Sequence, residues 1–510
     1  MWDYCEEMTT CIMTNKMLLE QVQREIMKES SPEPEEIDPT DFTDKLTDES
    51  LLFLFTYFNK VDLSRCNAVN KRWHKITSDR TLWKRVNFTP VLFNVDPNSF
   101  NVLLMSKMKF TEKIYLGSLR VTFKMFRSMV IHCKHLRTLI FGRNSTIEEP
   151  PGGRFKIHFP KCLQNLDIRL ANGKFEFLNE MQTNFVHLQN FGVSANSFDG
   201  IQLQTLFDRL PALKVVDFTN CHQMDDRGVE ALAYSCSNIK SLCLIGCRNV
   251  YGTSFDLLIE KCSELRTLLV RYLKIKDDII SQSFWSQSNL EELDISACPD
   301  LTWNGLYRLL PQLRSIEYLN MSFCGEGNAV NDIVLNEMAS AGSTKNLKML
   351  DIRWSFYITP HVLDAFFQKC PQLQHLGIYQ SLNIFCDHLQ EMIPKFPAMK
   401  ILEFGSSYPQ EFCHSPFIAQ LIITTKDIEV LSLINFTAAK EPSKVYKTIK
   451  NFTRRSVKLK RINLCDCSND LIKLAKQALK DNKRIQLTVK WECALPPPKY
   501  TLDSLTFANS

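Results

Sequence analysis

The chain has 510 residues, of which 45% are apolar and 23% are charged, and its formal net charge is +5. This balance predicts a folded chain with room for a large core. So small a charge does not indicate nucleic acid as a partner, and no apolar run approaches the roughly 18 residues of a membrane span. We therefore expect neither nucleic acid nor a membrane as a partner. The first ten residues are acidic and lack the regions of a signal peptide, so the eighteen cysteines predict free thiols in the cytoplasm or the nucleus.

The first 43 residues precede the first strongly patterned stretch. Residues 1–30 form either a helix, with Met17, Leu18, Val22 and Ile26 on one side, or a mobile arm. Residues 30–41, SSPEPEEIDPTD, are rich in proline and acidic side chains, which is typical of a linker. We assign residues 1–43 to an N-terminal arm and an acidic, proline-rich linker.

Residues 44–88 predict two or three short helices with more apolar surface than they can bury among themselves. Thr47 can cap the first helix, Asp62 the second and Asp79 the third. The apolar side chains recur at helical spacing: Leu51, Leu52, Phe55 and Phe58 in the first helix, and Leu63, Cys66, Val69, Trp73 and Ile76 in the second.

This stretch resembles an F-box. The resemblance rests on the order Leu-x-Asp-Glu-x-Leu-Leu-x-x-Phe-x-x-Phe from Leu46, followed by Asp-Leu-x-Arg-Cys, Lys-Arg-Trp and Leu-Trp. Thr47 and Asn70 depart from the family pattern, which has Pro and Cys there. The resemblance implies that these helices bind a Skp adaptor, and through it the cullin of a ubiquitin ligase. The side chains it assigns to adaptor binding are Leu46, Leu51, Leu52, Phe55, Leu63, Val69, Trp73 and Trp83.

After a connector at 89–110, residues 111–493 repeat the pattern Leu-x-x-Leu-x-Leu about fourteen times. Most repeats are 25–27 residues apart, and each short alternating strand is followed by a helical segment. One such unit cannot bury its own apolar face, so stacked units must share a continuous core. The first positions are Leu136, Leu163, Leu188, Leu213, Ile239, Leu265, Leu290, Ile316, Leu347, Leu373, Met399, Ile428, Leu459 and Ile485, with a degenerate first repeat at Ile114 and Leu116.

The period resembles the cysteine-containing leucine-rich repeat. The fold class is therefore α/β: a leucine-rich-repeat solenoid with a curved parallel sheet and outer helices, preceded by a small all-α F-box. Cysteines follow several strands and end several helices, where we expect them to act as small buried hydrophobes: Cys221, Cys247, Cys298, Cys324, Cys467, Cys236, Cys262 and Cys370.

Residues 494–510 form a tail that begins near three consecutive prolines, since proline cannot continue a strand ladder. Pro497 to Tyr500 also match the Pro-Pro-x-Tyr ligand of WW domains. The alternative is that the tail folds back onto the inner face of the solenoid.

Side chains beside the repeated leucines point outward, because side chains alternate along a strand. The middle of this surface mixes acidic residues with Arg and Tyr, the residue types enriched at binding hot spots. Because the acidic residues outnumber the Arg, we expect a partner segment that carries Lys or Arg. The predicted substrate-binding residues are Arg271, Glu292, Asp294, Tyr318, Asn320, Asp351, Arg353, His375 and Tyr379.

The sequence holds none of the catalytic signatures we sought: a Gly-rich phosphate loop, His-Glu-x-x-His or Gly-x-Ser-x-Gly. It also holds no C-x-x-C pair. We expect no enzyme, no cofactor and no metal. An enzyme would need a catalytic cluster on the irregular stretches 142–160 or 404–418, which hold His158 and His414 without further ligands at usable spacing.

These observations favour a substrate receptor of a Skp–cullin–F-box ubiquitin ligase, and the resemblance supplies the ubiquitin assignment. The F-box would hold the adaptor, and the concave repeat surface would hold a protein substrate for ubiquitination and proteasomal degradation. The alternative is a binding scaffold or inhibitor with no role in ubiquitination, whose N-terminal helices only cap the solenoid.

Overall fold

The computed structural model describes residues 46–88, 97–142, 145–148, 159–171, 186–194, 205–381, 384, 386–393, 396, 398–412, 420–421, 423–438, 442–490 and 493–503. The predicted arm and linker, His158 and His414 lie outside these residues. The chain divides into two compact units between Tyr57 and Phe58. None of the helices in the described part of the chain has the length and apolar character that a membrane-crossing helix requires.

The described part of the first unit is helix α2 (Asp48–Phe55) with its flanking residues. Thr47 caps it as predicted, because the Thr47 hydroxyl accepts a hydrogen bond from the Ser50 N–H at 3.2 Å. Two acidic residues occupy its first turn, where they stabilise the positive end of the helix.

The second unit starts with three short helices, α3 (Lys60–Cys66), α4 (Lys71–Thr77) and α5 (Arg80–Trp83). Asp79 caps α5 as predicted. Asp62 does not cap α3: the helix begins earlier, and Asn59 accepts the Asp62 N–H at 3.0 Å. Asn70, a departure from the F-box pattern, caps α4 by accepting the Trp73 N–H at 2.7 Å, so this substitution has a local structural role.

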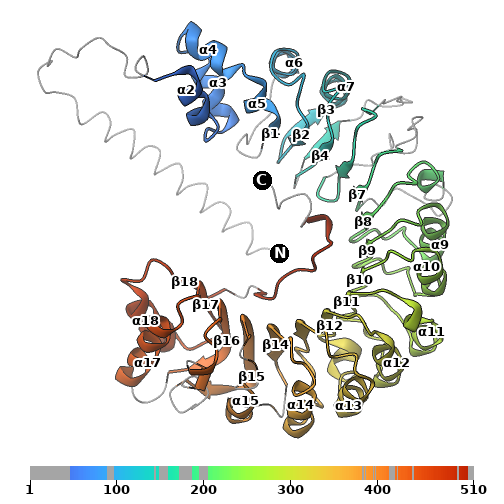
Figure 1. Cartoon of the computed structure of the whole chain (residues 1–510), viewed down its shortest axis with the longest axis vertical. Helices are drawn as coiled ribbons and strands as arrows, with labels where there is room; N and C mark the ends of the chain where they lie inside the picture. Colours follow the sequence, from blue (N-terminus) through green and yellow to red (C-terminus); the bar gives the residue numbers. More distant parts are fainter. Residues whose placement is uncertain are drawn as a thin grey trace, which may run out of the picture. The chain divides into compact units, whose positions relative to one another are not determined.

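A parallel sheet of 16 strands runs through the rest of the second unit, and consecutive repeats pair with each other along its whole length. Its strands line the inner side of an arc and the helices lie outside it (Figure 1). The strands are β1 (Arg85–Asn87), β2 (Lys113–Tyr115), β4 (Thr138–Ile140), β6 (Asn165–Asp167), β7 (Asn190–Gly192), β8 (Val215–Asp217), β9 (Ser241–Cys243), β10 (Thr267–Leu269), β11 (Glu292–Asp294), β12 (Tyr318–Asn320), β13 (Met349–Asp351), β14 (His375–Tyr379), β15 (Ile401–Glu411), β16 (Val430–Thr437), β17 (Arg461–Cys465) and β18 (Gln486–Thr488).

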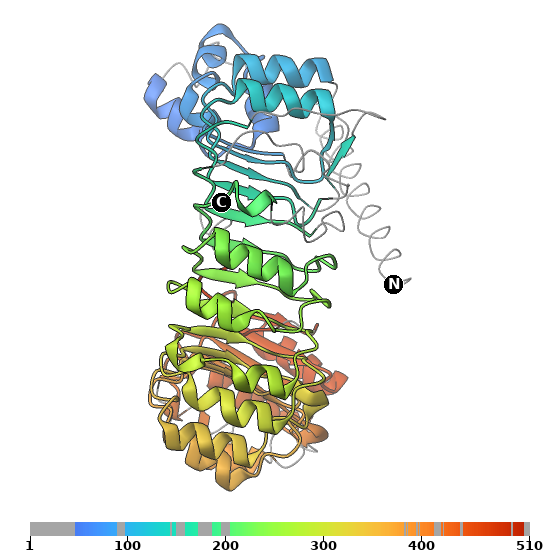
Figure 2. The ribbon, with the colours of Figure 1, turned by 90° about the vertical axis from the view of Figure 1, so that its right-hand side faces the viewer.

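Outer helices cover the sheet, and Figure 2 shows those drawn from green to yellow stacked on one another in chain order. Such stacking follows from the repeat, because each helix packs its apolar face onto the same shared core. The helices are α6 (Pro97–Ser106), α7 (Phe123–His132), α9 (Asp226–Ser235), α10 (Phe255–Lys261), α11 (Asp277–Gln282), α12 (Trp303–Leu309), α13 (Asp332–Ala341), α14 (Pro360–Phe367), α15 (Cys386–Met392), α17 (Pro442–Arg455) and α18 (Asn469–Leu479).

The repeat register is confirmed. Each of the fourteen predicted first positions lies one or two residues before a strand, from β4 to β18, and β2 contains the degenerate repeat at Ile114. The repeated inward residue is buried in each of the matching strands from β4 to β17, as Leu293 and Leu319 illustrate with no exposed surface, and Leu487 of the last strand, β18, is half-buried. The cysteines after the strands and at the helix ends are also buried, apart from the half-buried Cys467.

Three elements differ from the expectation. The sheet begins before residue 111, because β1 lies within the predicted F-box stretch and pairs with β2. Residues 404–411 belong to the long strand β15, which pairs with β16, and not to an irregular stretch. A separate two-stranded parallel sheet joins β3 (Arg120–Thr122) and β5 (Thr146–Glu148), and its strands lack the leucine signature of the repeats.

Candidate functional site

The inner face of the sheet carries the predicted substrate-binding residues. They come from the five neighbouring repeats of β10 to β14, either from the strand or from the residues that follow it, because outward positions recur in register from repeat to repeat. Most of these side chains are nevertheless buried, including both acidic residues of β11, Asn320 and Asp351. Something other than solvent therefore covers this face.

The C-terminal tail crosses the inner face of the sheet. The alternative in which the tail folds back onto this face is therefore the one that the structure adopts. The Lys499 N–H donates to Glu292 Oε1 at 2.6 Å, and the Lys499 ammonium pairs with Glu317 at 2.5 Å. Further along, Asp503 pairs with Arg169 at 2.5 Å. The described tail runs back from β15 towards β6, which requires an almost extended chain. Three consecutive prolines favour such a chain.

Two glycines of the sheet receive leucines of the tail. A Cβ atom added to Gly192 would lie 2.4 Å from Leu502, and one added to Gly377 would lie 2.8 Å from Leu495. Leu495 also packs against Tyr318 and Met349 in a buried cluster. The neighbouring strands hold larger side chains in register, Asp167 and Asp217 beside Gly192 and Asp351 and Glu403 beside Gly377, so the missing side chains make room for the tail.

Two arginines on the inner face are each held by carboxylates from two strands. Arg353 donates to Asp351 at 2.6 and 2.8 Å and to Glu403 at 2.7 Å, and it also lies 3.4 Å from the Cys493 sulfur of the tail. Burial acts to lower the pKa of Arg353, but the two carboxylates outweigh it and raise the pKa. Arg353 therefore stays charged and fixed in place.

Arg169 has the same arrangement near the other end of the tail. It bonds Asp167 from its own strand, Asp217 from a later strand and Asp503 from the tail. Burial acts to lower its pKa, and the surrounding carboxylates again raise it. The acidic side chains of this face thus neutralise arginines of the chain itself, which removes the reason to expect a partner rich in Lys or Arg.

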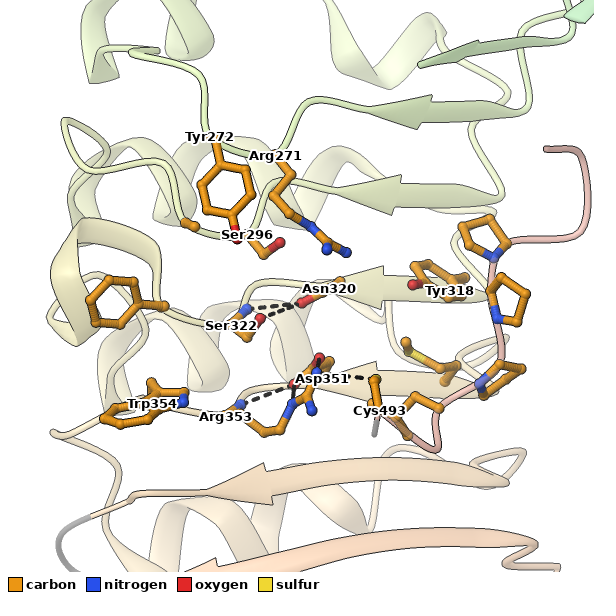
Figure 3. Close-up of a pocket in the computed structure, with 17 residues that line it drawn as sticks. Arg271, Tyr272, Ser296, Tyr318, Asn320, Ser322, Asp351, Arg353, Trp354 and Cys493 are labelled. Atoms are coloured by element: carbon orange, nitrogen blue, oxygen red, sulfur yellow. Dashed lines mark hydrogen bonds and ion pairs between the residues drawn. The ribbon is translucent and has the colours of Figure 1, made fainter. Parts of the chain in front are cut away.

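A pocket of about 690 Å³ opens between the tail and the turns that follow β10 to β13. The prolines of the tail form one side with Tyr318 next to them, Asn320 lies in the middle, and Tyr272 and Trp354 lie on the opposite side (Figure 3). Cys493 of the tail also lines the pocket. This volume is in the usual range for pockets that bind small molecules or peptide side chains.

The aromatic side of the pocket stands on strained backbone. Tyr272, Phe323 and Trp354 have φ values of +64°, +56° and +60°, in the left-handed region. The same turn position holds Asn220 and Gly246 in earlier repeats, residue types that tolerate this conformation. The left-handed region costs a bulky residue about 1–2 kcal/mol, and all three aromatic side chains are exposed. Exposed apolar groups on strained backbone are typical of functional surfaces.

The pocket brings together five of the nine predicted substrate-binding residues: Arg271, Tyr318, Asn320, Asp351 and Arg353. Asp294 is not among the residues that line it but pairs with Arg271, while Glu292 accepts a hydrogen bond from the tail. His375 and Tyr379 do not line it. Tyr379 packs with Ile434 and Cys465, and burial, then the nearby Lys400, lowers the pKa of His375 to about 4.

Sequence reasoning missed the aromatic row of Tyr272, Phe323 and Trp354. Each lies three residues after the last residue of a strand, beyond the outward columns that alternation predicts. A signal was present: in several other repeats the same position holds Asn, Asp or Gly, as at Asn220, Gly246, Asn435 and Asp466, and three aromatic residues there depart from those types.

The predicted adaptor-binding residues divide by exposure. Leu51, Phe55, Leu63 and Trp83 are buried, and Leu46, Leu52 and Trp73 are partly buried; of the predicted set only Val69 is exposed. Phe53, Leu54 and Tyr57 of the first unit lie between the predicted stripe positions and are exposed. Phe58 and Val69 of the second unit belong to the predicted stripes and are nevertheless exposed.

Trp83 has a structural role within the second unit. Its ring N–H donates to the Thr77 carbonyl at 2.6 Å, and its own carbonyl accepts the Thr111 hydroxyl at 2.7 Å. The next residue, Lys84, accepts backbone N–H groups from the start of β2. Helices α3 to α5 therefore join continuously to the first strand of the sheet.

Comparisons with known proteins agree with the two patterns in the sequence. A family model described as F-box-like matches residues 46–89, and one described as Leucine Rich repeat matches residues 210–233. Among solved structures, a chain in the crystal structure of the Rad7 and Elc1 complex in yeast is similar at 15% identity, covering 85% of this chain and 96% of that chain, with a TM-score of 0.40. A leucine-rich-repeat protein of Leptospira interrogans is similar at 12% identity, covering 82% and 92%, with a TM-score of 0.37.

Proposed function

We propose, because the chain carries an F-box-like domain followed by leucine-rich repeats, that this protein is the substrate-recognition subunit of a Skp–cullin–F-box ubiquitin ligase. The match of the F-box-like model to residues 46–89 is the observation that carries the proposal. The helices would bind the Skp adaptor and, through it, a cullin. The inner face of the repeats would bind a protein substrate.

The proposed mechanism is proximity. A receptor that holds the adaptor and the substrate at once raises the effective concentration of the substrate at the ubiquitin-charged enzyme. The chain itself would perform no bond chemistry and would need no cofactor. Its buried free cysteines suit the reducing cytoplasm or nucleus, where we propose that it acts.

Exposed apolar side chains support adaptor binding by the F-box-like helices. Phe53, Leu54 and Tyr57 extend into solvent from one short segment of the first unit, and Val69 does so in the second. Aromatic and large apolar side chains are the usual anchors of protein interfaces. We therefore propose these side chains as adaptor contacts, in place of the buried Leu51, Phe55, Leu63 and Trp83.

The burial of Trp83 and Leu63 also supports the cap described as the alternative, because α3 to α5 are continuous with the first strand. The two roles do not compete, since the side chains that would cap the sheet are not those exposed for an adaptor. Adaptor binding is the property that separates a ligase receptor from a scaffold that is only capped.

Co-purification with the Skp adaptor tests the proposal. The Phe53→Ala, Leu54→Ala double variant should lose the adaptor and keep its melting transition, because both side chains are exposed. Ile333→Ala, which removes an exposed apolar side chain from the outer helix α13, is the matched control. If the wild-type chain does not retain the adaptor, the ligase assignment is wrong and the capped scaffold remains.

A further inference from the structure

Three arginines occupy equivalent positions in their repeats, each two residues after the last residue of a strand. They are Arg169 after β6, Arg271 after β10 and Arg353 after β13. Arg169 and Arg353 each bridge a carboxylate of their own strand and a carboxylate two strands further along, and each also touches the tail. These two arginines therefore share one arrangement, in which the guanidinium pairs with two carboxylates of the sheet.

Arg271 departs from that arrangement. Its own strand ends in Leu269 where the others end in Asp, and among the described residues its one carboxylate partner is Asp294, at 2.5 Å. Its side chain is 36% exposed, against 10% for Arg169 and 9% for Arg353. Within the described structure, its buried Nε atom also has no hydrogen-bond partner. Arg271 is thus the least neutralised arginine of the three.

Arg169 and Arg353 each have a second carboxylate partner, whereas Arg271 faces the pocket instead. Arg271 lines it, and the described tail residues on its far side, Cys493, Leu495 and three prolines, carry no carboxylate. Asp351 already binds Arg353, and Asp294 accepts bonds from Arg271 and from the Ser296 hydroxyl at 2.6 Å. A cation entering this pocket would find carboxylates that are already paired, whereas an anion would find one incompletely paired arginine.

The exposed aromatic row indicates a second feature of the ligand, besides its negative charge. Tyr272, Phe323 and Trp354 present ring surface to the same pocket, and Phe323 and Trp354 are in edge-to-face contact with their centroids 6.0 Å apart. Such a wall favours an apolar or aromatic side chain, because ring contacts and apolar burial both stabilise it there.

We propose that this pocket binds a partner protein through a short segment in which an Asp or Glu lies beside a bulky apolar residue. The carboxylate pairs with Arg271 as its second carboxylate, and the apolar side chain packs on Tyr272, Phe323 and Trp354. This inference names the substrate class of the receptor and so rests on the proposed function. It replaces the expectation of a basic partner segment with an acidic and apolar one.

Selection from a phage-displayed library of random twelve-residue peptides, with the full-length chain as the target, tests the proposal. Enriched peptides should share an Asp or Glu within three positions of Phe, Trp, Leu or Met. Binding of a synthesised, labelled peptide should weaken at least tenfold with Arg271→Gln, and similarly when the peptide's acidic residue becomes Asn or Gln. Both changes together should cost little more than either one, because they remove the same ion pair.

Three further variants keep the test decisive. Arg308→Gln removes an exposed arginine from the outer helix α12 and should leave binding unchanged. Trp354→Ser removes apolar surface without removing a charge and should weaken binding severalfold. If Arg271→Gln fails to fold, Arg271→Lys, which keeps the charge, should fold and bind within about tenfold of wild type.

Enrichment of basic peptides, enrichment without an acidic residue, no enrichment, or equal binding by Arg271→Gln and Arg308→Gln would each overturn the inference. Adaptor co-purification is measured on the same preparations and depends on the F-box-like helices. A chain that retains the adaptor but selects no acidic peptide refutes only this inference, and a chain that selects such peptides but binds no adaptor refutes only the ligase assignment.

Discussion

Removing Arg353 should destabilise the solenoid strongly, although it lies on the face that alternation marks as outward. Its side chain is 9% exposed, and its partners Asp351 and Glu403 are 1% and 2% exposed. Arg353→Met would leave two buried carboxylates without their cation and would remove three hydrogen bonds of 2.6–2.8 Å. Breaking a buried ion pair on one side typically costs about 3–5 kcal/mol, so we expect a loss of this size in the free energy of unfolding.

Urea unfolding followed by circular dichroism at pH 7 measures this loss, with Arg308→Met as the exposed control, expected within about 0.5 kcal/mol of wild type. Burial already raises the pKa of Glu403. In the variant, carboxylates with a raised folded-state pKa cost stability as pH rises above their unfolded-state values, so the deficit should shrink on acidification. Adding Asp351→Asn and Glu403→Gln should recover part of it. A deficit below about 1 kcal/mol at pH 7 would refute the buried-network reasoning.

Three other perturbations have defined outcomes. Leu293→Ala should cost about 2–5 kcal/mol by leaving a cavity in the shared core, and an unchanged melting transition would contradict the inward register. His375 has a pKa of about 4, lowered first by burial, so its contribution to stability is complete above pH 6.5 and is lost as pH falls towards 4. His375→Phe should flatten that part of the pH–stability profile. An unaltered profile would argue against a buried neutral ring. Leu495→Asp should release the tail and speed tryptic cleavage after Lys499, followed by mass spectrometry, whereas Ile333→Asp on an outer helix should not; equal rates would mean that the tail is not held by its leucine.

The repeat architecture was predictable because its cause is local and recurrent. A unit with leucines at its first, fourth and sixth positions, repeated every 26 residues or so, has few ways to bury them other than stacking. Each first position of the pattern lies within two residues of the start of a strand. The start of the sheet was not predictable in this way, because β1 at Arg85–Asn87 carries a single inward residue, Val86, and no leucine pattern.

The site was only partly predictable. Alternation placed Arg271, Tyr318, Asn320, Asp351 and Arg353 on one face, and the structure brings all five to one pocket. The alternation of side chains does not predict that Arg353 pairs with two carboxylates and Arg271 with one. That difference depends on which carboxylates of neighbouring strands reach each guanidinium. For the same reason the surplus of acidic residues pointed to a basic partner that the paired network does not favour.

The sequence alone determined the periodic fold and the F-box-like character of residues 46–89, because both depend on residue types that recur at short, regular spacing along the chain. Tertiary structure decided which apolar side chains of the F-box-like helices are exposed, since helical spacing groups Phe58 and Val69 with residues that are buried. It also decided that residues 493–503 cover the inner face and form one side of the pocket. That outcome depends on two glycines and several glutamates that lie about 90 to 310 residues away along the chain, and a contact at such separation leaves no pattern in the local sequence.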